Sequence, residues 1–189
     1  MRSLVLLVLF LPCALGQIPR PPRWDKFQFT FEFRAREEAR TGVGFGRDHN
    51  IENLLFRTRI GANWEPLPWL KLSAMGQDTR APLYGTRAPG SARETIDLQE
   101  SYIELFPGRK RGFGAVAGRQ MLNYGEGRLI GTPQWVNAAR TCDAARAYYR
   151  LPWARFEFLF VSTVKVASDA YNKPELGDLL WECMIRFRG

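Results

Sequence analysis

Apolar and polar residues alternate along several stretches of the chain. In the clearest stretch, phenylalanine stands at every second position and polar residues fill the gaps: Phe27, Phe29, Phe31 and Phe33, with Gln28, Thr30, Glu32 and Arg34 between them. Successive side chains of a β-strand point to opposite faces. A period of two therefore predicts a strand with one apolar face and one polar face.

Eight strands of this kind are expected. Their approximate ranges are 27–34, 55–64, 70–77, 96–106, 113–121, 143–150, 155–166 and 179–187. Within 96–106 the apolar positions change parity, which indicates either a β-bulge or a strand that starts at another residue. The connections between the strands alternate between long and short, and the short ones are 65–69, 107–112 and 151–154.

This alternation of connection lengths separates two classes of all-β protein. A soluble β-sandwich gives no reason for it. Outer-membrane barrels have tilted strands of ~9–11 residues, with short turns at one end and long loops at the other. Trp64, Trp69 and Trp153 stand at or beside the short turns, where an interfacial aromatic girdle would fall. The sequence therefore predicts an antiparallel transmembrane β-barrel whose apolar faces contact outer-membrane lipid.

The first 16 residues have the features of a signal peptide. Arg2 gives a positive start, residues 4–11 form an apolar core, and Ala14-Leu15-Gly16 is a small-x-small cleavage site. The apolar run is too short to span a bilayer as a helix. We therefore expect residues 1–16 to be a signal peptide and 17–189 to be the domain exported to the outer membrane of a gram-negative bacterium.

The chain is basic, and most of its basic residues are arginine. The chain has 27 Lys+Arg against 19 Asp+Glu, a formal net charge of +8, and 22 of the basic residues are arginine. Several arginines fall on the polar faces of the expected strands: Arg34, Arg36, Arg57, Arg59, Arg119, Arg146 and Arg150, with Glu32 and Glu157 as counter-charges. Two interpretations stay open. The arginines line a conduit that concentrates anions, or they brace the barrel wall through Arg–Glu pairs.

Catalytic and metal chemistry find little support. The sole histidine, His49, lies in a polar loop, and the three cysteines stand far apart at 13, 142 and 183. Cys142 and Cys183 fall on expected strands that are not neighbours, so a disulfide is not expected. We expect no metal, no cofactor, no enzymatic step and no nucleic-acid partner.

A series of short segments follows one another in a particular order: 46–48, 55–61, 76–80, 97–102, 118–120 and 124–131, continued by Trp135, Asn137, Arg140, Asp143 and Arg146. Together these segments resemble the alginate export family of outer-membrane porins. The resemblance implies passive, selective passage of an anionic polysaccharide such as alginate, or of a small acidic solute, through a barrel inserted by the barrel-assembly machinery.

The arginines on the family's motif positions are Arg57, Arg59, Arg119, Arg128, Arg140 and Arg146. The resemblance implies that they line the pore and meet the carboxylates of the solute. Arg128 and Arg140 belong to the long connection 122–141, which is expected to fold into the pore as a constriction.

The number of strands differs from the family's pattern. Family members form a barrel of about eighteen strands, whereas about eight are expected here. We therefore expect the chain to be a truncated, N-terminal part of such a barrel. The alternative is a small closed eight-stranded barrel with a structural or adhesion role, whose interior is filled by side chains. A third hypothesis, an outer-membrane lipid hydrolase, depends on His49.

Overall fold

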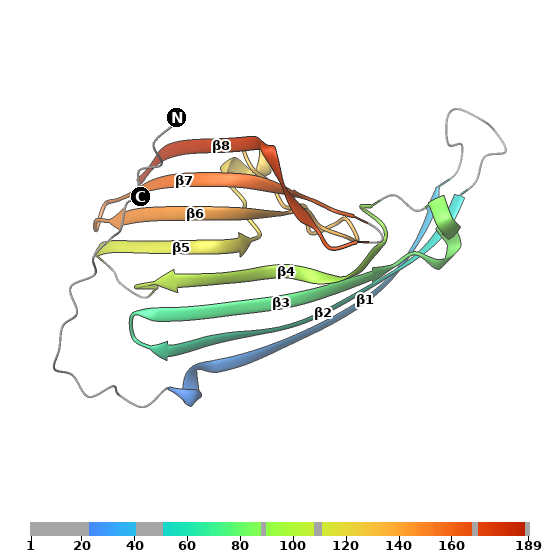
Figure 1. The fold of residues 1–189 in the computed structure, drawn as a ribbon, viewed down its shortest axis with the longest axis horizontal. Helices are drawn as coiled ribbons and strands as arrows, with labels where there is room; N and C mark the ends of the chain where they lie inside the picture. Colours follow the sequence, from blue (N-terminus) through green and yellow to red (C-terminus); the bar gives the residue numbers. More distant parts are fainter. Residues whose placement is uncertain (1–22, 41–50, 88–89, 108–110, 168–169, 188–189) are drawn as a thin grey trace, which may run out of the picture.

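The computed structural model describes residues 23–40, 51–87, 90–107, 111–167 and 170–187. These residues form one antiparallel sheet of eight strands that pair in chain order (Figure 1). The strands are β1 (Phe27–Arg40), β2 (Ile51–Leu67), β3 (Leu70–Arg80), β4 (Glu94–Leu105), β5 (Gly112–Gln120), β6 (Thr141–Arg150), β7 (Ala154–Lys165) and β8 (Lys173–Phe187). The predicted all-β, antiparallel fold is confirmed.

A short 3-10 helix, η1 (Trp24–Lys26), precedes β1, and two others lie in connections between strands: η3 (Pro82–Arg87) and η4 (Gly125–Gly127). The short connections, β2–β3, β4–β5 and β6–β7, lie at one end of the sheet, and the long ones lie at the other. At the β4–β5 turn, Phe106 and Gly112 have φ of 56° and 101°, left-handed values that reverse the chain within a few residues. The predicted alternation of connection lengths is therefore confirmed.

The change of parity within the fourth strand reflects a β-bulge in β4. Met75 of β3 pairs with Glu100, while its neighbour Gly76 pairs with Leu98. Gln99 is thus the extra residue that shifts the alternation. Several strands begin earlier than predicted, most of all β8, which begins at Lys173 instead of 179. Its first residues include Pro174, which does not fit the alternating pattern used to find strands.

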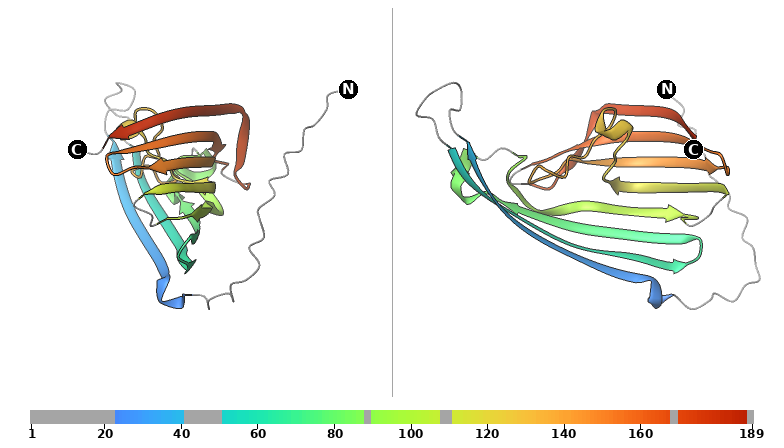
Figure 2. Two further views of the ribbon diagram at one scale, coloured as in Figure 1. Left: turned by 90° about the vertical axis from the view of Figure 1, so that its left-hand side faces the viewer. Right: turned by 180° about the vertical axis from the view of Figure 1, so that it is seen from behind.

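The sheet curls strongly but is not closed (Figure 2). β1 and β8 are its two edges within the described residues. This open sheet is consistent with part of a larger barrel. The alternative of a closed eight-stranded barrel is not what the structure shows, because closure would require β1 to pair with β8. Within the described residues, no helix is long and apolar enough to cross a membrane.

The outer face of the sheet is strongly apolar. Phe29 and Phe31 of β1 are 66% and 61% exposed. Other large apolar side chains exposed on the strands include Phe27, Phe33, Ile60, Ile103, Phe113, Phe156, Phe158, Phe160, Trp181 and Ile185. A soluble monomer rarely exposes a contiguous apolar surface of this extent, whereas a lipid-facing barrel wall requires one.

Aromatic residues also gather at the short-turn end. Trp69 and Trp153 are exposed there, and Trp153 stacks on Phe187 with ring centroids 6.2 Å apart. Trp64 is half-buried and stacks on Trp24 of η1 at 4.7 Å. This grouping matches the girdle predicted for the membrane–water interface.

Candidate functional site

The long connection between β5 and β6, residues 121–140, lies across the concave side of the curled sheet (Figure 2). Its N-terminal part packs on β6 and β7, where Leu122 and Tyr124 join a buried cluster with Cys142 and Leu159. Its C-terminal part receives hydrogen bonds from side chains of β1 and β2. These strands are far apart in the sheet order, so the segment bridges the concavity. We call residues 121–140 the bridging segment.

Arginines of β1 and β2 hold the backbone of the bridging segment. Arg34 donates to the carbonyl oxygens of Gln134 and Val136 at 3.0 and 3.1 Å. Arg57 donates to the same two oxygens at 3.1 and 3.3 Å, and its Nε donates to Glu32 at 3.0 Å. Both guanidinium groups are therefore engaged by the protein itself.

Arg59 lies two residues after Arg57 on the same face of β2 and belongs to a hydrogen-bonded network of side chains. Its Nε donates to Gln77 Oε1 at 2.7 Å, and its Nη1 donates to Gln134 Oε1 at 2.9 Å. Gln77 in turn donates to Glu94 at 2.8 Å and to Gln99 at 3.1 Å. Arg57 and Arg59 are each only 4% exposed, so a solute in the concavity has little direct access to them.

Arg36 completes this group, which we call the β1–β2 arginine cluster (Arg34, Arg36, Arg57 and Arg59). Arg36 forms an ion pair with Glu38 at 2.7 Å, and its guanidinium lies 4.0 Å from the centroid of the Trp135 ring. Two carboxylates, Glu32 and Glu38, form ion pairs with arginines of this four-cation cluster. Backbone carbonyl dipoles stabilise the arginines without cancelling their charge, so the cluster keeps a positive potential.

A second basic group lies on β6 and β7. Arg146 Nη1 lies 3.6 Å from Glu157 Oε1, and Arg155 Nη2 lies 3.1 Å from the same oxygen. The Tyr124 hydroxyl donates to Glu157 at 2.9 Å and accepts from Arg146 at 3.2 Å. Burial raises the pKa of Tyr124 above its usual value, so the phenol stays neutral near pH 7. A cavity of about 220 Å³ adjoins this group, and Arg186 also lines it.

Arg119, another predicted pore-lining residue, lies outside both groups. It follows Gly118, whose φ of 125° interrupts the alternation of β5, and it donates to Asn172 O at 3.4 Å. It stands directly across from Asp143 and forms a two-contact ion pair with it, at 2.8 and 3.1 Å. β5 is rich in Gly and Ala, so its apolar pattern was too weak to fix the parity.

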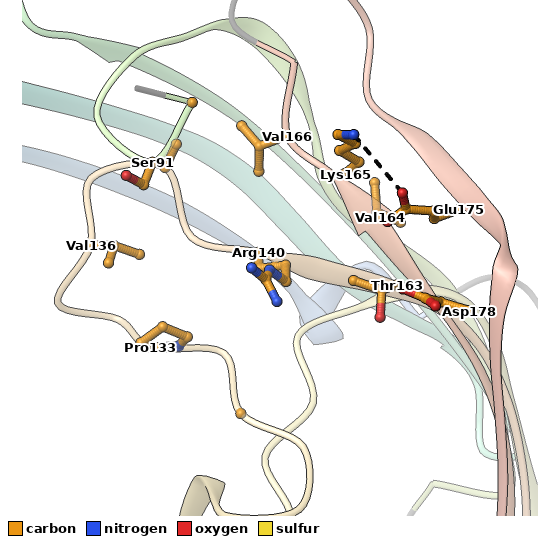
Figure 3. Close-up of a pocket in the computed structure, with 13 residues that line it drawn as sticks. Ser91, Pro133, Val136, Arg140, Thr163, Val164, Lys165, Val166, Glu175 and Asp178 are labelled. Carbon is orange, nitrogen blue, oxygen red and sulfur yellow. Dashed lines mark ion pairs between the residues drawn. The ribbon is translucent and has the colours of Figure 1, made fainter. Parts of the chain in front are cut away.

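The remaining two predicted residues, Arg128 and Arg140, lie on the bridging segment and are exposed. Within the described residues, neither guanidinium has an ion pair or hydrogen bond. Arg140 projects into a cavity of about 560 Å³ at the long-loop end of the sheet (Figure 3). The cavity is also lined by Ser91, Thr163, Asp178 and the Lys165–Glu175 ion pair, whose charged atoms are 3.9 Å apart.

Three residues that organise this site received no role from the sequence: Tyr124, Gln134 and Asn137. The hydrogen bonds of Asn137 join residues 45 to 103 positions apart, and Gln134 accepts from Arg59, 75 positions away. No local pattern reports such a contact. Asn137 stands on a family motif position, which is the one signal that could have singled it out.

Two other predictions concern groups without a place in this site. His49 lies outside the described residues. Cys142 and Cys183 stand on β6 and β8, which are not adjacent, and both are free thiols. In the part of the chain that the structure describes, no cluster of three or more His, Cys, Asp or Glu side chains could hold a metal ion.

Comparison with known proteins identifies the family. No curated protein and no solved structure matches the chain. The sequence profile described as alginate export matches residues 23–173, which span β1 to the first residue of β8. This match covers most of the chain and includes the arginine-lined face and the bridging segment. The chain therefore belongs to the alginate export family, a transport family of outer-membrane porins.

Proposed function

We propose that this protein provides a passage across the outer membrane for an anionic polysaccharide of the alginate type, without a covalent step. The observation that carries the proposal is the contrast between the two faces of one sheet. The outer face exposes large apolar side chains, and the concave face carries the β1–β2 arginine cluster, Arg146 and Arg155. Anionic solutes are attracted into a concavity of this charge, and cations are repelled.

The arginines divide this work. Arg57 and Arg59 are almost fully buried, so they act on a solute through their positive potential. Arg128 and Arg140 are exposed and within the described residues have no counter-charge in contact, so they are free to pair with a carboxylate. A guanidinium binds a carboxylate through two parallel hydrogen bonds. Such contacts in water are weak and short-lived, which suits a solute that must move on.

The cavity around Arg140 fits one acidic sugar better than a bare anion. Ser91 and Thr163 can donate to and accept from sugar hydroxyls, and Asp178 and Glu175 can accept from them. Arg140 supplies the one exposed guanidinium among these lining residues for a carboxylate (Figure 3). Its volume of about 560 Å³ is within the range of small-molecule sites.

Ion selectivity tests the proposal. The full chain, refolded and inserted into planar bilayers, is expected to conduct with an anion preference in a KCl gradient, and oligouronate is expected to reduce the current. Combining Arg128→Gln and Arg140→Gln is expected to weaken that preference. Arg23→Gln, which removes one positive charge from the segment before β1, is the control for either substitution alone and should leave selectivity unchanged. Absence of a pore, or a cation preference, would overturn the proposal.

A further inference from the structure

The bridging segment is attached to the sheet at two places with an exposed stretch between them. Tyr124 is 4% exposed and Asn137 is 1% exposed. Between these two residues, 125–129 and most of 131–135 are exposed. The exposed stretch carries Arg128 and spans the concavity. Its position therefore depends on these two attachments and on the arginine bonds to Gln134 and Val136 beside the second one.

Asn137 makes the attachment to β2, β3 and β4. Its amide nitrogen donates to the carbonyl oxygens of Phe56 at 2.9 Å and Ala92 at 2.8 Å, and it lies 3.4 Å from that of Arg80. Phe56 belongs to β2, Arg80 is the last residue of β3, and Ala92 lies two residues before β4. One side chain thus joins three neighbouring parts of the sheet at the point where β3 and β4 separate.

Both the nitrogen and the oxygen of the Asn137 amide form hydrogen bonds. Its Oδ1 accepts from Arg34 Nη2 at 3.4 Å. The backbone next to it is fixed as well: Ala138 N donates to Ser91 O at 2.9 Å, and Gln99 Nε2 donates to Ala139 O at 3.1 Å. A planar amide with two donors and one acceptor satisfies this arrangement, whereas a carboxylate of the same size has no hydrogen to donate to the carbonyl oxygens.

Tyr124 makes the second attachment. Its hydroxyl donates to Glu157 of β7, its backbone N–H donates to Ile130 O at 2.8 Å, and its ring belongs to the buried cluster on β6 and β7. This attachment combines apolar contacts with hydrogen bonds. It holds the start of the segment even if the Asn137 contacts are lost.

We propose that Asn137 is the positioning residue that fixes the bridging segment as a permanent constriction. It sets the width of the passage and the place of Arg128 within it. With Asn137 replaced, the segment remains tied at Tyr124, and its C-terminal half keeps the arginine bonds to Gln134 and Val136 but loses its side-chain attachment to β2, β3 and β4. The effect on passage rests on the proposed function, whereas the attachment itself is measured independently of conduction.

The test compares Asn137→Ala and Asn137→Asp with Asn123→Ala, the matched control. Asn123 is an exposed asparagine of the same segment. In detergent-solubilised full chain, both Asn137 variants are expected to speed amide hydrogen exchange across 125–136 by about tenfold or more. Trypsin cleavage after the exposed Arg128 is expected to accelerate in parallel. Exchange in β6 and β7 should stay unchanged, and the control should behave like the natural chain.

Conductance measurements distinguish a role of Asn137 in passage from a purely structural role, which would leave conductance unchanged. In planar bilayers, the Asn137 variants are expected to show a larger unit conductance with a weaker anion preference, because the constriction widens and Arg128 moves. Faster exchange of all strands, or no change in exchange at 125–136, would overturn the positioning role. Faster exchange with unaltered conductance would overturn the role in passage. A chain that forms no pore refutes the proposed function, while exchange still decides the attachment.

Discussion

The β1–β2 arginine cluster and the two arginines of the bridging segment are the same residue type in opposite situations. Arg57 and Arg59 are buried and bind Glu32, Gln77 and the bridging segment. Arg128 and Arg140 are exposed, and within the described residues they bind nothing. The cluster supplies structure and potential, whereas the exposed pair is available to a solute.

The comparison shows why a count of arginines on a face overstates its binding capacity. A guanidinium has five N–H donors in a fixed fork, so it can join several backbone carbonyls that no other side chain would satisfy together. The cluster uses that property to hold the bridging segment. The conduit and the bracing interpretations of the arginines are therefore not exclusive, because each describes a different subset.

The largest expected effect is on stability when a buried arginine is removed. Arg57→Gln takes the paired cation from Glu32 and donors from the Gln134 and Val136 carbonyls. The expected loss is about 2–3 kcal/mol in the free energy of unfolding, because Glu32 is partly exposed and regains water. Urea unfolding of the refolded chain in micelles, followed by tryptophan fluorescence, measures it. If Arg57→Gln lowered the free energy of unfolding no more than Arg140→Gln, the β1–β2 arginine cluster would not differ from the exposed arginines in its effect on stability.

A smaller effect is expected at the other attachment. Tyr124→Phe removes one hydroxyl that donates to Glu157 and accepts from Arg146, and it keeps the buried ring. The expected loss is about 1 kcal/mol at neutral pH. If Tyr124→Phe lowers the free energy of unfolding as much as Arg57→Gln, the polar contacts on β6 and β7 stabilise the fold as strongly as those on β1 and β2.

The same tyrosine gives a pH dependence whose sign is fixed. Burial raises the pKa of Tyr124 in the folded state above its usual value of about 10. A raised folded pKa means that the folded state holds the proton more tightly. Its contribution is complete below pH 10 and is lost as pH rises through the higher folded value. The stability difference between the natural chain and Tyr124→Phe should therefore be constant up to about pH 9 and shrink above pH 10.

Arg119 offers a case between the two groups. It is paired with Asp143 and also donates to Asn172 O at 3.4 Å. Asp143 is partly exposed, so Arg119→Gln is expected to cost about 0.5–1 kcal/mol. The reversal potential in a KCl gradient should not change. A shift in reversal potential as large as that of Arg140→Gln would mean that Arg119 acts on the permeating ions as a pore-lining residue does.

The extent of sequence-based prediction differs between the strands and the site. Period-two alternation was enough to locate all eight strands and the parity change in β4, because lipid on one side and polar groups on the other impose a strong pattern. The pattern is weakest in the Gly-rich β5, where it does not fix the side of the sheet on which Arg119 lies. The hydrogen bonds that place the bridging segment, such as Arg34 to Gln134, join residues 100 positions apart. They depend on how the sheet curls, and no local pattern encodes that.

The smallest effect on stability is expected at Arg140, and it is the most informative one. Arg140 is exposed, and within the described residues it has no hydrogen bond or ion pair, so Arg140→Gln should change the unfolding free energy by less than about 0.5 kcal/mol. It should nevertheless weaken the anion preference and raise the oligouronate concentration that halves the current. Arg57→Gln should show the opposite balance: a large stability loss and, in the folded fraction, a smaller rise in the blocking oligouronate concentration, because Arg57 acts on the solute through its potential alone. Because Arg140 lies at the cavity of about 560 Å³ and Arg57 lies beneath the bridging segment, only the former can touch the solute. If both variants raised the blocking oligouronate concentration equally, direct contact with the solute would not distinguish Arg140 from Arg57.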